Sequence, residues 1–301
     1  MKKISLISVV AIFIAVAVVS CKDDPPPSTT PPDNPEPGVD TFVSKKIETA
    51  TFLLEELTGV SCGYCPDGHK KADDLAAITF PGKFFVINVH AGSYANWPPP
   101  NDLRTDFGEA LVSFSKTTGF PAGMINRRVF PAPYPQQVNA PAMSRGYWGT
   151  VCNSIASEVP YVNVAARTTI NSADRTLECK VQVYYTDDAT ALINNINVAV
   201  LQNEIVARQD EYGDYYPERH TSDGKYRHMH VLRHLVTGQW GEAIDSEMKK
   251  GNLYEKTFTW TVPTDMKTLP MPLENLEVLV FITEMVNTPV IKVCKSTIEI
   301  K

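Results

Sequence analysis

The chain has 301 residues, of which 43% are hydrophobic and 21% are charged, and these values are ordinary for a soluble globular protein. At about 150 residues per domain, this length suggests about two domains. The composition excludes a collagen, a coiled coil and a wholly disordered chain. The net charge of −6 offers no basic excess to follow a phosphate backbone, so we expect no nucleic-acid partner. Six cysteines are too few to be the main scaffold at this length.

Residues 1–20 are typical of a secretory signal peptide. Two lysines give a positive start, and residues 4–19 form a largely apolar run that is short for a membrane span of about 20 residues. Cys21 directly follows the small residue Ser20. This arrangement resembles the lipobox of bacterial lipoproteins, in which the cysteine is acylated and becomes the N-terminus. An ordinary signal peptide followed by a chance cysteine is the alternative.

Residues 21–42 are predicted to form a lipidated, proline-rich tether. Seven of the 23 prolines lie in residues 25–40, and proline favours extended polyproline II, so no core forms there. Residues 22–24, Lys-Asp-Asp, resemble the charged export signal of Bacteroidetes surface lipoproteins. No later run is long and apolar enough to span a bilayer. We therefore expect a protein that is anchored to a membrane through Cys21 and does not cross it.

A strand, a turn, a helix and a strand follow the tether in the sequence pattern. Residues 51–57 and 83–90 read as strands, residues 69–76 as a helix, and Cys62 and Cys65 lie in the turn between them. A CxxC pair in this context indicates a thioredoxin-like redox motif. Because a helix N-terminus lowers a cysteine pKa, Cys62 is predicted to be the exposed nucleophile and Cys65 the resolving thiol. The same two cysteines are a candidate disulfide.

Two further positions match thioredoxin-like proteins. Glu56 lies six residues before Cys62, an offset at which such proteins often carry a buried carboxylate that moves protons for the resolving thiol. A solvated charge at the strand end is the alternative. Pro121 follows a helix candidate at residues 102–117, and thioredoxin-like folds place a cis-proline at this point, opposite the CxxC. Phe120 would then line the cleft beside Cys62.

The remaining cleft residues are predicted from their places in the pattern. Gly63 and Tyr64 stand between the cysteines, and this dipeptide resembles that of periplasmic disulfide isomerases more than that of cytosolic reductants. His90 ends the second strand, and strand ends border active sites in open α/β sheets; a hydrogen-bonded structural histidine is the alternative. No second CxxC or Cys/His pair stands at zinc-finger spacing, so we predict no metal and no cofactor.

Several segments together resemble those of one family: residues 54–59 (LEELTG), 62–69 (CGYCPDGH), 89–92 (VHAG), 119–127 (GFPAGMINR), 226–233 (YRHMHVLR) and 238–242 (GQWGE). The family is the outer-membrane-protein-28-related (Omp28-like) lipoprotein family of Bacteroidetes, and the resemblance covers residues 48–300. It implies an outer-membrane lipoprotein, facing the cell surface or the periplasm, with a thioredoxin-like domain and an appended β domain. Adhesion has been proposed for members, so the resemblance leaves the reaction open.

From residue 161 onward, the hydrophobic pattern changes to a period of two, as in strands. The strand candidates include residues 181–185, 197–201, 258–262, 278–282 and 290–293. The predicted fold is therefore an α/β thioredoxin-like domain over residues 43–158, closed by a helix at residues 140–157, and an all-β immunoglobulin-like sandwich over residues 159–301. Residues 207–250 are a polar and aromatic insert in the second domain.

The other cysteines and two histidines are read as structural. Cys179 and Cys294 lie on early and late strands of the predicted sandwich, and a disulfide between them is a candidate in an exported protein. Cys152, in the closing helix, reads as a small buried hydrophobe. His228 and His230 would share one face of a strand, but no acidic or cysteine ligand stands at a fixed offset, so we favour hydrogen-bonded histidines over a metal site.

Two functions fit these features. The first is thiol–disulfide exchange on extracytoplasmic proteins through Cys62 and Cys65, which would make the protein an oxidoreductase or isomerase. The second is a non-catalytic surface lipoprotein, an adhesin or a partner-binding module, in which the thioredoxin-like fold is a scaffold. The expected partners are the membrane, through the lipid on Cys21, and extracytoplasmic proteins.

Overall fold

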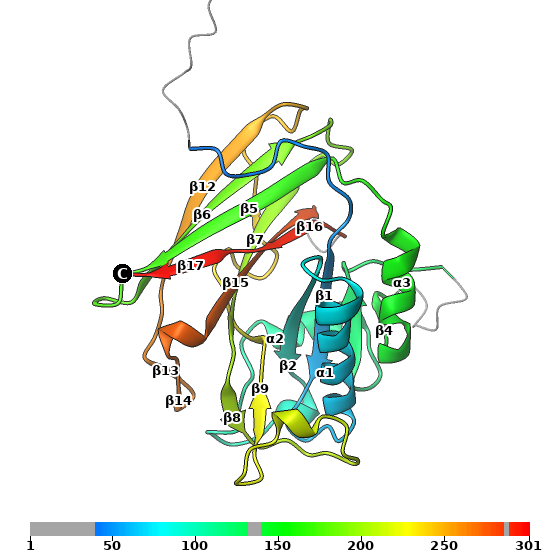
Figure 1. Ribbon diagram of the computed structural model, residues 1–301, viewed down its shortest axis with the longest axis vertical. Coiled ribbons are helices and arrows are strands. Elements are labelled where there is room, and N and C mark those ends of the chain that lie inside the picture. The colour runs from blue at the N-terminus through cyan, green and yellow to red at the C-terminus, as the bar shows by residue number, and fades with distance from the viewer. Residues whose placement is uncertain (1–39, 132–139, 286–288) are drawn as a thin grey trace, which may run out of the picture. The chain divides into compact units, whose positions relative to one another are not determined.

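The computed structural model describes residues 40–131, 140–285 and 289–301. The chain divides into two compact units, residues 1–40 and 41–301, and the helices and strands described below belong to the second. This second unit is mixed α/β with a large share of strand (Figure 1). The predicted signal peptide, Cys21 and most of the tether lie outside the described residues.

Within the part of the chain that the structure describes, the larger sheet has nine strands. They are β1 (Phe52–Thr58), β2 (Phe84–His90), β3 (Ala122–Ile125), β4 (Ala142–Ser144), β7 (Asn194–Gln202), β10 (Val231–Leu235), β11 (Glu242–Ala243), β15 (Leu276–Glu284) and β16 (Val290–Lys295). The order is β16-β15-β7-β10-β2-β1-β3-β4, with β11 beside β7. Strands from both sides of residue 158 thus share one sheet, and the boundary between two domains at that point stays a prediction.

The smaller sheet has four strands in the order β12-β6-β5-β17. They are β5 (Val162–Ile170), β6 (Thr176–Tyr185), β12 (Leu253–Thr261) and β17 (Thr297–Ile300). One apolar cluster combines side chains of this sheet, such as Val181, with side chains of the larger sheet, such as Val198 and Val280. The two sheets therefore pack against each other over a shared apolar layer.

The described residues also form two short strand pairs. They are β8 (Ile205–Ala207) with β9 (Tyr226–His228), and β13 (Asp265–Met266) with β14 (Leu269–Pro270).

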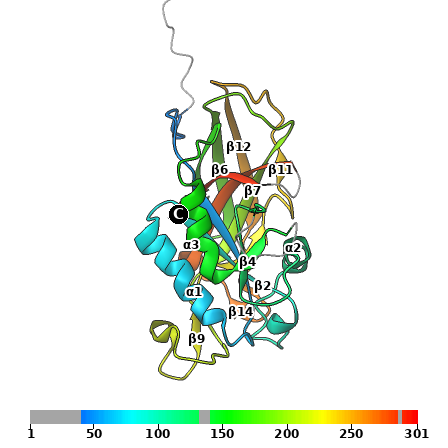
Figure 2. The ribbon, with the colours of Figure 1, turned by 90° about the vertical axis from the view of Figure 1, so that its right-hand side faces the viewer.

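Helices cover both faces of the larger sheet around β1 (Figure 2). The helix α1 (Cys65–Asp74), continued by a π-helical turn at Leu75–Thr79, and the helix α3 (Trp148–Ile155) lie on one face, and α2 (Gly108–Ser115) lies on the other. Alternating residues of β1 explain this arrangement, because successive strand side chains point to opposite faces. Phe52 and Leu54 pack with α3, whereas Leu53 and Leu57 pack with α2.

Both predicted helices of this region are shorter in the structure. The helix predicted at residues 102–117 covers only Gly108–Ser115. The closing helix predicted at residues 140–157 covers only Trp148–Ile155, because residues 142–144 form β4 and pair antiparallel with β3. The apolar residues of this segment have the spacing of a helix, but hydrogen bonds to β3 hold residues 142–144 as a strand. The sequence pattern does not reveal this pairing.

Cys179 and Cys294 are free in the structure, in contrast to the candidate disulfide between them. Both side chains belong to the apolar layer between the two sheets. Burial raises the pKa of Cys179 to about 11 and that of Cys294 to about 12. Both groups are therefore held as thiols, and disulfide formation requires a thiolate. Cys152 is free and buried in α3.

A buried ion pair links β1 to the second half of the chain. Arg127 donates two hydrogen bonds to Glu55, of 2.7 and 2.8 Å, and the two side chains are only 1% and 2% exposed. The guanidinium also lies over the rings of Trp240 and Phe281, 5.5 and 5.2 Å from their centroids. The pair therefore supports the packing between residues on both sides of the predicted domain boundary.

Substitution of Arg127 by leucine is expected to lower the free energy of unfolding by about 3–5 kcal/mol, because it leaves the Glu55 carboxylate buried without its partner. The neighbouring Arg128→Leu variant is the matched control. Arg128 pairs with Glu158 near the surface, so its loss should cost at most about 1 kcal/mol. Urea unfolding measures both values, and equal losses in the two variants would contradict the assigned role of the buried pair.

Candidate functional site

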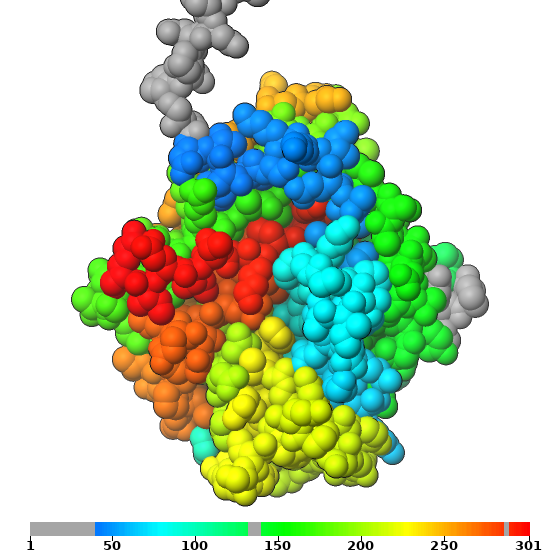
Figure 3. All heavy atoms as spheres, in the orientation of Figure 1, coloured from blue at the N-terminus to red at the C-terminus, as the bar shows by residue number. Residues whose placement is uncertain are grey.

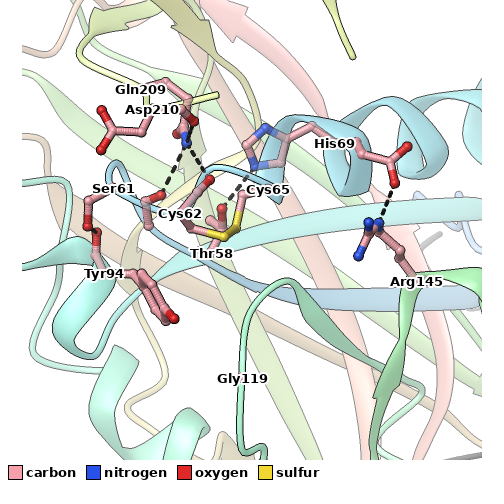
Figure 4. The surroundings of a disulfide bond; sticks show 12 residues. Thr58, Ser61, Cys62, Cys65, His69, Tyr94, Gly119, Arg145, Gln209 and Asp210 are labelled. Carbon is pink, nitrogen blue, oxygen red and sulfur yellow. Dashed lines mark hydrogen bonds and ion pairs between the residues drawn. A yellow bond between two sulfur atoms is a disulfide. The ribbon is translucent and has the colours of Figure 1, made fainter. Parts of the chain in front are cut away.

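Cys62 and Cys65 are joined by a disulfide at the N-terminal end of α1, with their Cα atoms 5.4 Å apart (Figure 4). Cys65 is the first residue of the helix, and Pro66 lies in its first turn, where a missing N–H group leaves no acceptor unpaired. The turn packs closely on the loop after β2, since a Cβ atom at Gly59 would lie 2.5 Å from the Tyr94 backbone. The Cys62–Cys65 disulfide is thereby fixed at a helix N-terminus. After reduction, that position favours the thiolate form of a cysteine.

Both cysteines are buried in the structure. Cys62 is 2% exposed and Cys65 is 0% exposed, whereas the sequence pattern predicts Cys62 to be an exposed nucleophile. The segment of residues 208–216, here named the cap, lies between β8 and β9 and covers the CxxC turn. This segment belongs to the polar and aromatic insert, which the sequence pattern reveals without indicating what it contacts.

The cap binds the turn through hydrogen bonds and one aromatic ring. Gln209 Nε2 donates to the carbonyl oxygen of Cys62 at 3.0 Å, and the Tyr212 N–H group donates to that of Gly63 at 3.0 Å. The Tyr212 ring packs directly on Gly63, since a Cβ atom at residue 63 would lie only 2.6 Å from the nearest ring atoms. A larger residue at position 63 would therefore displace this ring. Gly63 is buried, while Tyr64 remains 47% exposed.

Glu56 is fully buried between α1 and Pro121. A Cβ atom at Gly68 would lie 2.3 Å from Glu56 Oε1 and 3.1 Å from Pro121 Cβ, so the absence of a side chain at residue 68 makes room for the long glutamate. Burial raises the pKa of the Glu56 carboxyl well above its ordinary value, and the negative charge of Asp73 raises it further. The carboxyl therefore holds a proton under conditions in which an exposed glutamate is ionised.

The peptide bond between Phe120 and Pro121 is cis. Phe120 packs against the ring of Tyr94, with centroids 5.5 Å apart, so it borders the loop after β2. A pocket of about 300 Å3 lies beside the proline and is lined by Thr117, Thr118, Gly119, Pro121, Ala122, Ala142, Met143 and Ser144. In Figure 4, Gly119 lies on the side of the disulfide away from Gln209 of the cap.

His90 does not line a cleft, contrary to the sequence-based expectation. It is 2% exposed, and its ring lies against that of His228, with centroids 5.2 Å apart. Neither ring nitrogen of His90 has a hydrogen-bond partner among the residues that the structure describes. The reason is that β9, from the second half of the chain, covers the end of β2. Burial lowers the pKa of His90 and lowers that of His228 to about 4, so both rings are neutral at pH 7.

His69 is a further residue of the site, and the sequence pattern did not predict it there. It lies one helical turn after Cys65, and its ring nitrogens are each 3.0 Å from a hydroxyl oxygen, those of Thr58 and Tyr226. Burial lowers the pKa of His69, and His228 lowers it further. The spacing from Cys65 could have indicated a position facing the sheet, but no local signal indicates contact with Tyr226, which is 157 residues away.

The other histidines near the site do not form the strand pair expected from sequence. His228 ends β9, whereas His230 follows it with a positive φ of 53° and lies 2.9 Å from a Glu277 oxygen. Within residues 40–131, 140–285 and 289–301, no group of three metal-ligating side chains could hold a metal ion. In the same described part of the chain, none of the helices has the length and apolar character needed to cross a bilayer.

Comparison with known proteins defines the class of the molecule. The sequence model for the family described as Outer membrane protein Omp28 matches residues 109–301, which is more than half of the chain, and this class consists of outer-membrane lipoproteins. The chain belongs to the Omp28 family. The predicted family and the outer-membrane location are thereby confirmed. No curated protein matches the chain.

Several solved structures are similar to the chain at low sequence identity. HBP35 of Porphyromonas gingivalis is 14% identical with a TM-score of 0.62, covering 83% of this chain and 76% of that one. A domain of the outer membrane lipoprotein Omp28 from Porphyromonas gingivalis is 16% identical with a TM-score of 0.32, covering 47% and 91%. A protein from Agrobacterium tumefaciens is 12% identical with a TM-score of 0.46, covering 83% and 95%. The likeness to HBP35 extends to the fold alone.

Substitution of Glu56 by glutamine should flatten part of the pH dependence of stability. A raised carboxyl pKa means that the folded protein binds more protons than the unfolded one above pH 4.5, the ordinary value. The free energy of unfolding then falls, by about 1.4 kcal/mol per pH unit, until the folded pKa is reached. Glutamine mimics the protonated form and cannot ionise. Urea unfolding from pH 4 to pH 8 tests this, and parallel curves for the two proteins would contradict it.

Proposed function

We propose that this outer-membrane lipoprotein exchanges thiols and disulfides with extracytoplasmic proteins through Cys62 and Cys65. The observation that carries the proposal is the buried Glu56 carboxyl, placed between the CxxC helix at Gly68 and the cis-proline Pro121. A protonated acid held behind a disulfide at a helix N-terminus provides both a stabilised thiolate and a proton for the leaving sulfur.

The exchange reaction follows from this arrangement. A substrate thiolate attacks Cys62 Sγ, forms a mixed disulfide and breaks the bond to Cys65. The Cys65 thiolate leaves with the electron pair and takes the proton of Glu56. A second substrate thiolate then attacks the substrate sulfur of the mixed disulfide, so that Cys62 leaves as a thiolate stabilised by the helix. The substrate dithiol is oxidised by two electrons, and the protein disulfide is reduced.

The proposal includes the finer structural assignments and the anchor. We assign residues 43–158 to a thioredoxin-like domain, supported by the parallel β1 and β2, the antiparallel β3 and the CxxC at the start of α1. We assign residues 159–301 to an immunoglobulin-like sandwich, supported by the packing of two sheets over one apolar layer. Membership of a lipoprotein family supports acylation at Cys21.

A second candidate function is a non-catalytic surface module that binds a partner or acts as an adhesin. The observation that favours it is the burial of both cysteines beneath the cap. In that case the Cys62–Cys65 disulfide would only support the fold. The two candidates differ in whether the disulfide reacts with thiols while the protein remains folded.

Substitution of Cys62 by serine should abolish exchange in the purified protein, because it removes the attacked sulfur. In the reverse direction, the Cys62 thiolate attacks a substrate disulfide and the Cys65 thiolate releases the reduced substrate. Substitution of Cys65 by serine should therefore accumulate mixed disulfides between Cys62 and oxidised substrates, because no second thiol remains to release them. Reduction of insulin measures the first effect, and mass spectrometry of trapped proteins measures the second. Cys294→Ser is the control, since that thiol belongs to the apolar layer between the two sheets and not to the CxxC turn. A wild-type protein with no exchange activity would favour the non-catalytic candidate.

A further inference from the structure

The cap occupies the face of the CxxC turn on which an extended polypeptide could lie. The Asp210 N–H group donates to the Val60 carbonyl at 2.8 Å, and the Tyr212 N–H group donates to the Gly63 carbonyl at 3.0 Å. These two donors are two residues apart, as are successive donors along one edge of a strand. The cap thus satisfies two main-chain acceptors of the turn, and an extended polypeptide carries N–H donors at the same spacing.

The part of the cap that contacts the CxxC turn, around Gln209 and Tyr212, contributes little to the protein interior. Tyr212 remains 72% exposed, although its ring lies on Gly63 and meets the Tyr64 ring edge to face, with centroids 5.1 Å apart. Gln209 is partly exposed and donates to the carbonyl oxygens of Cys62 and Gly59 at 3.0 and 3.3 Å. So few contacts at the surface of the molecule can open locally without unfolding of the core.

The other half of the cap is tied to α1. The Tyr216 hydroxyl donates to Asp73 at 2.6 Å, and Arg219, just beyond the cap, forms an ion pair with the same carboxylate. Glu211 accepts hydrogen bonds from the Tyr215 and Tyr216 N–H groups. Figure 3 shows the yellow segment that contains the cap lying against the cyan segment that contains α1. The contacting half can therefore leave the turn while the segment remains attached.

We propose that the cap determines the substrate class of the exchange reaction, by excluding small thiols and giving way to extended polypeptides. This inference rests on the proposed function. Opening the cap leaves the carbonyl groups of Val60 and Gly63 without their donors. An extended polypeptide supplies N–H groups at the same spacing and recovers those hydrogen bonds, whereas a small thiol supplies none. Binding energy from parts of a substrate remote from the reacting sulfur thus offsets the cost of opening.

The test compares two thiols on the full-length protein in detergent. The probes are dithiothreitol, a small thiol, and reduced, unfolded ribonuclease A, an extended polypeptide. Initial rates of reduction of Cys62–Cys65 are measured by acid quench and alkylation, for the wild type and for the Gln209→Ala/Tyr212→Ala double variant. Tyr147→Ala, which removes a partly exposed tyrosine outside the cap, is the matched control, and circular dichroism checks that each variant is folded.

In the double variant, the rate with dithiothreitol should rise about tenfold, a factor that corresponds to the loss of one or two net contacts. The rate with ribonuclease A should change much less, and the control should match the wild type with both thiols. An unchanged rate with dithiothreitol, or an equal rise with both thiols, would overturn the inference. A Cys65→Ser trap that captures no cellular protein would refute only the proposed function, because the rate comparison needs no native partner.

Discussion

The parallel pairing of β2 with β10 is the constraint on which the site depends. The two strands meet at Asn88 and Val231, where the Asn88 N–H group donates to the His230 carbonyl and its side chain donates to the Met229 carbonyl, both at 2.8 Å. This short junction joins the CxxC half of the chain to the second half within one sheet. It also brings β9 and the cap onto the end of β2, so neither half forms the site by itself.

The junction creates a buried polar layer beneath α1. Glu56 and Asn88 are register partners on β1 and β2, as are Thr58 and His90, and residues with the same parity on paired strands share a face of the sheet. A buried charge without a partner is costly, so the titratable groups of this layer adopt their neutral forms. Burial therefore favours the protonated form of Glu56 and the neutral form of His90, so this layer beneath α1 carries little net charge.

Local sequence signals predicted the parts of the site that lie within one segment. The strand at residues 83–90 and a helix after the CxxC pair follow from spacing and residue type, although α1 starts at Cys65 and not at residue 69. The burial of Glu56 was expected from the match to thioredoxin-like proteins. The cap, the environment of His90 and the extent of the closing helix could not be predicted in this way. Each depends on contact with a segment that is separate in the sequence. For example, residues 142–144 form β4, and not the start of a helix, because they pair with β3.

The distance along the chain between the cysteines and the cap has a consequence for the order in which the site is completed. Gln209 follows Cys62 by 147 positions, and β10 is later still. A chain that emerges N-terminus first from an export channel presents both thiols to its surroundings before the covering residues arrive. Oxidation of the pair can therefore precede closure, and the cap then settles on a disulfide that already exists.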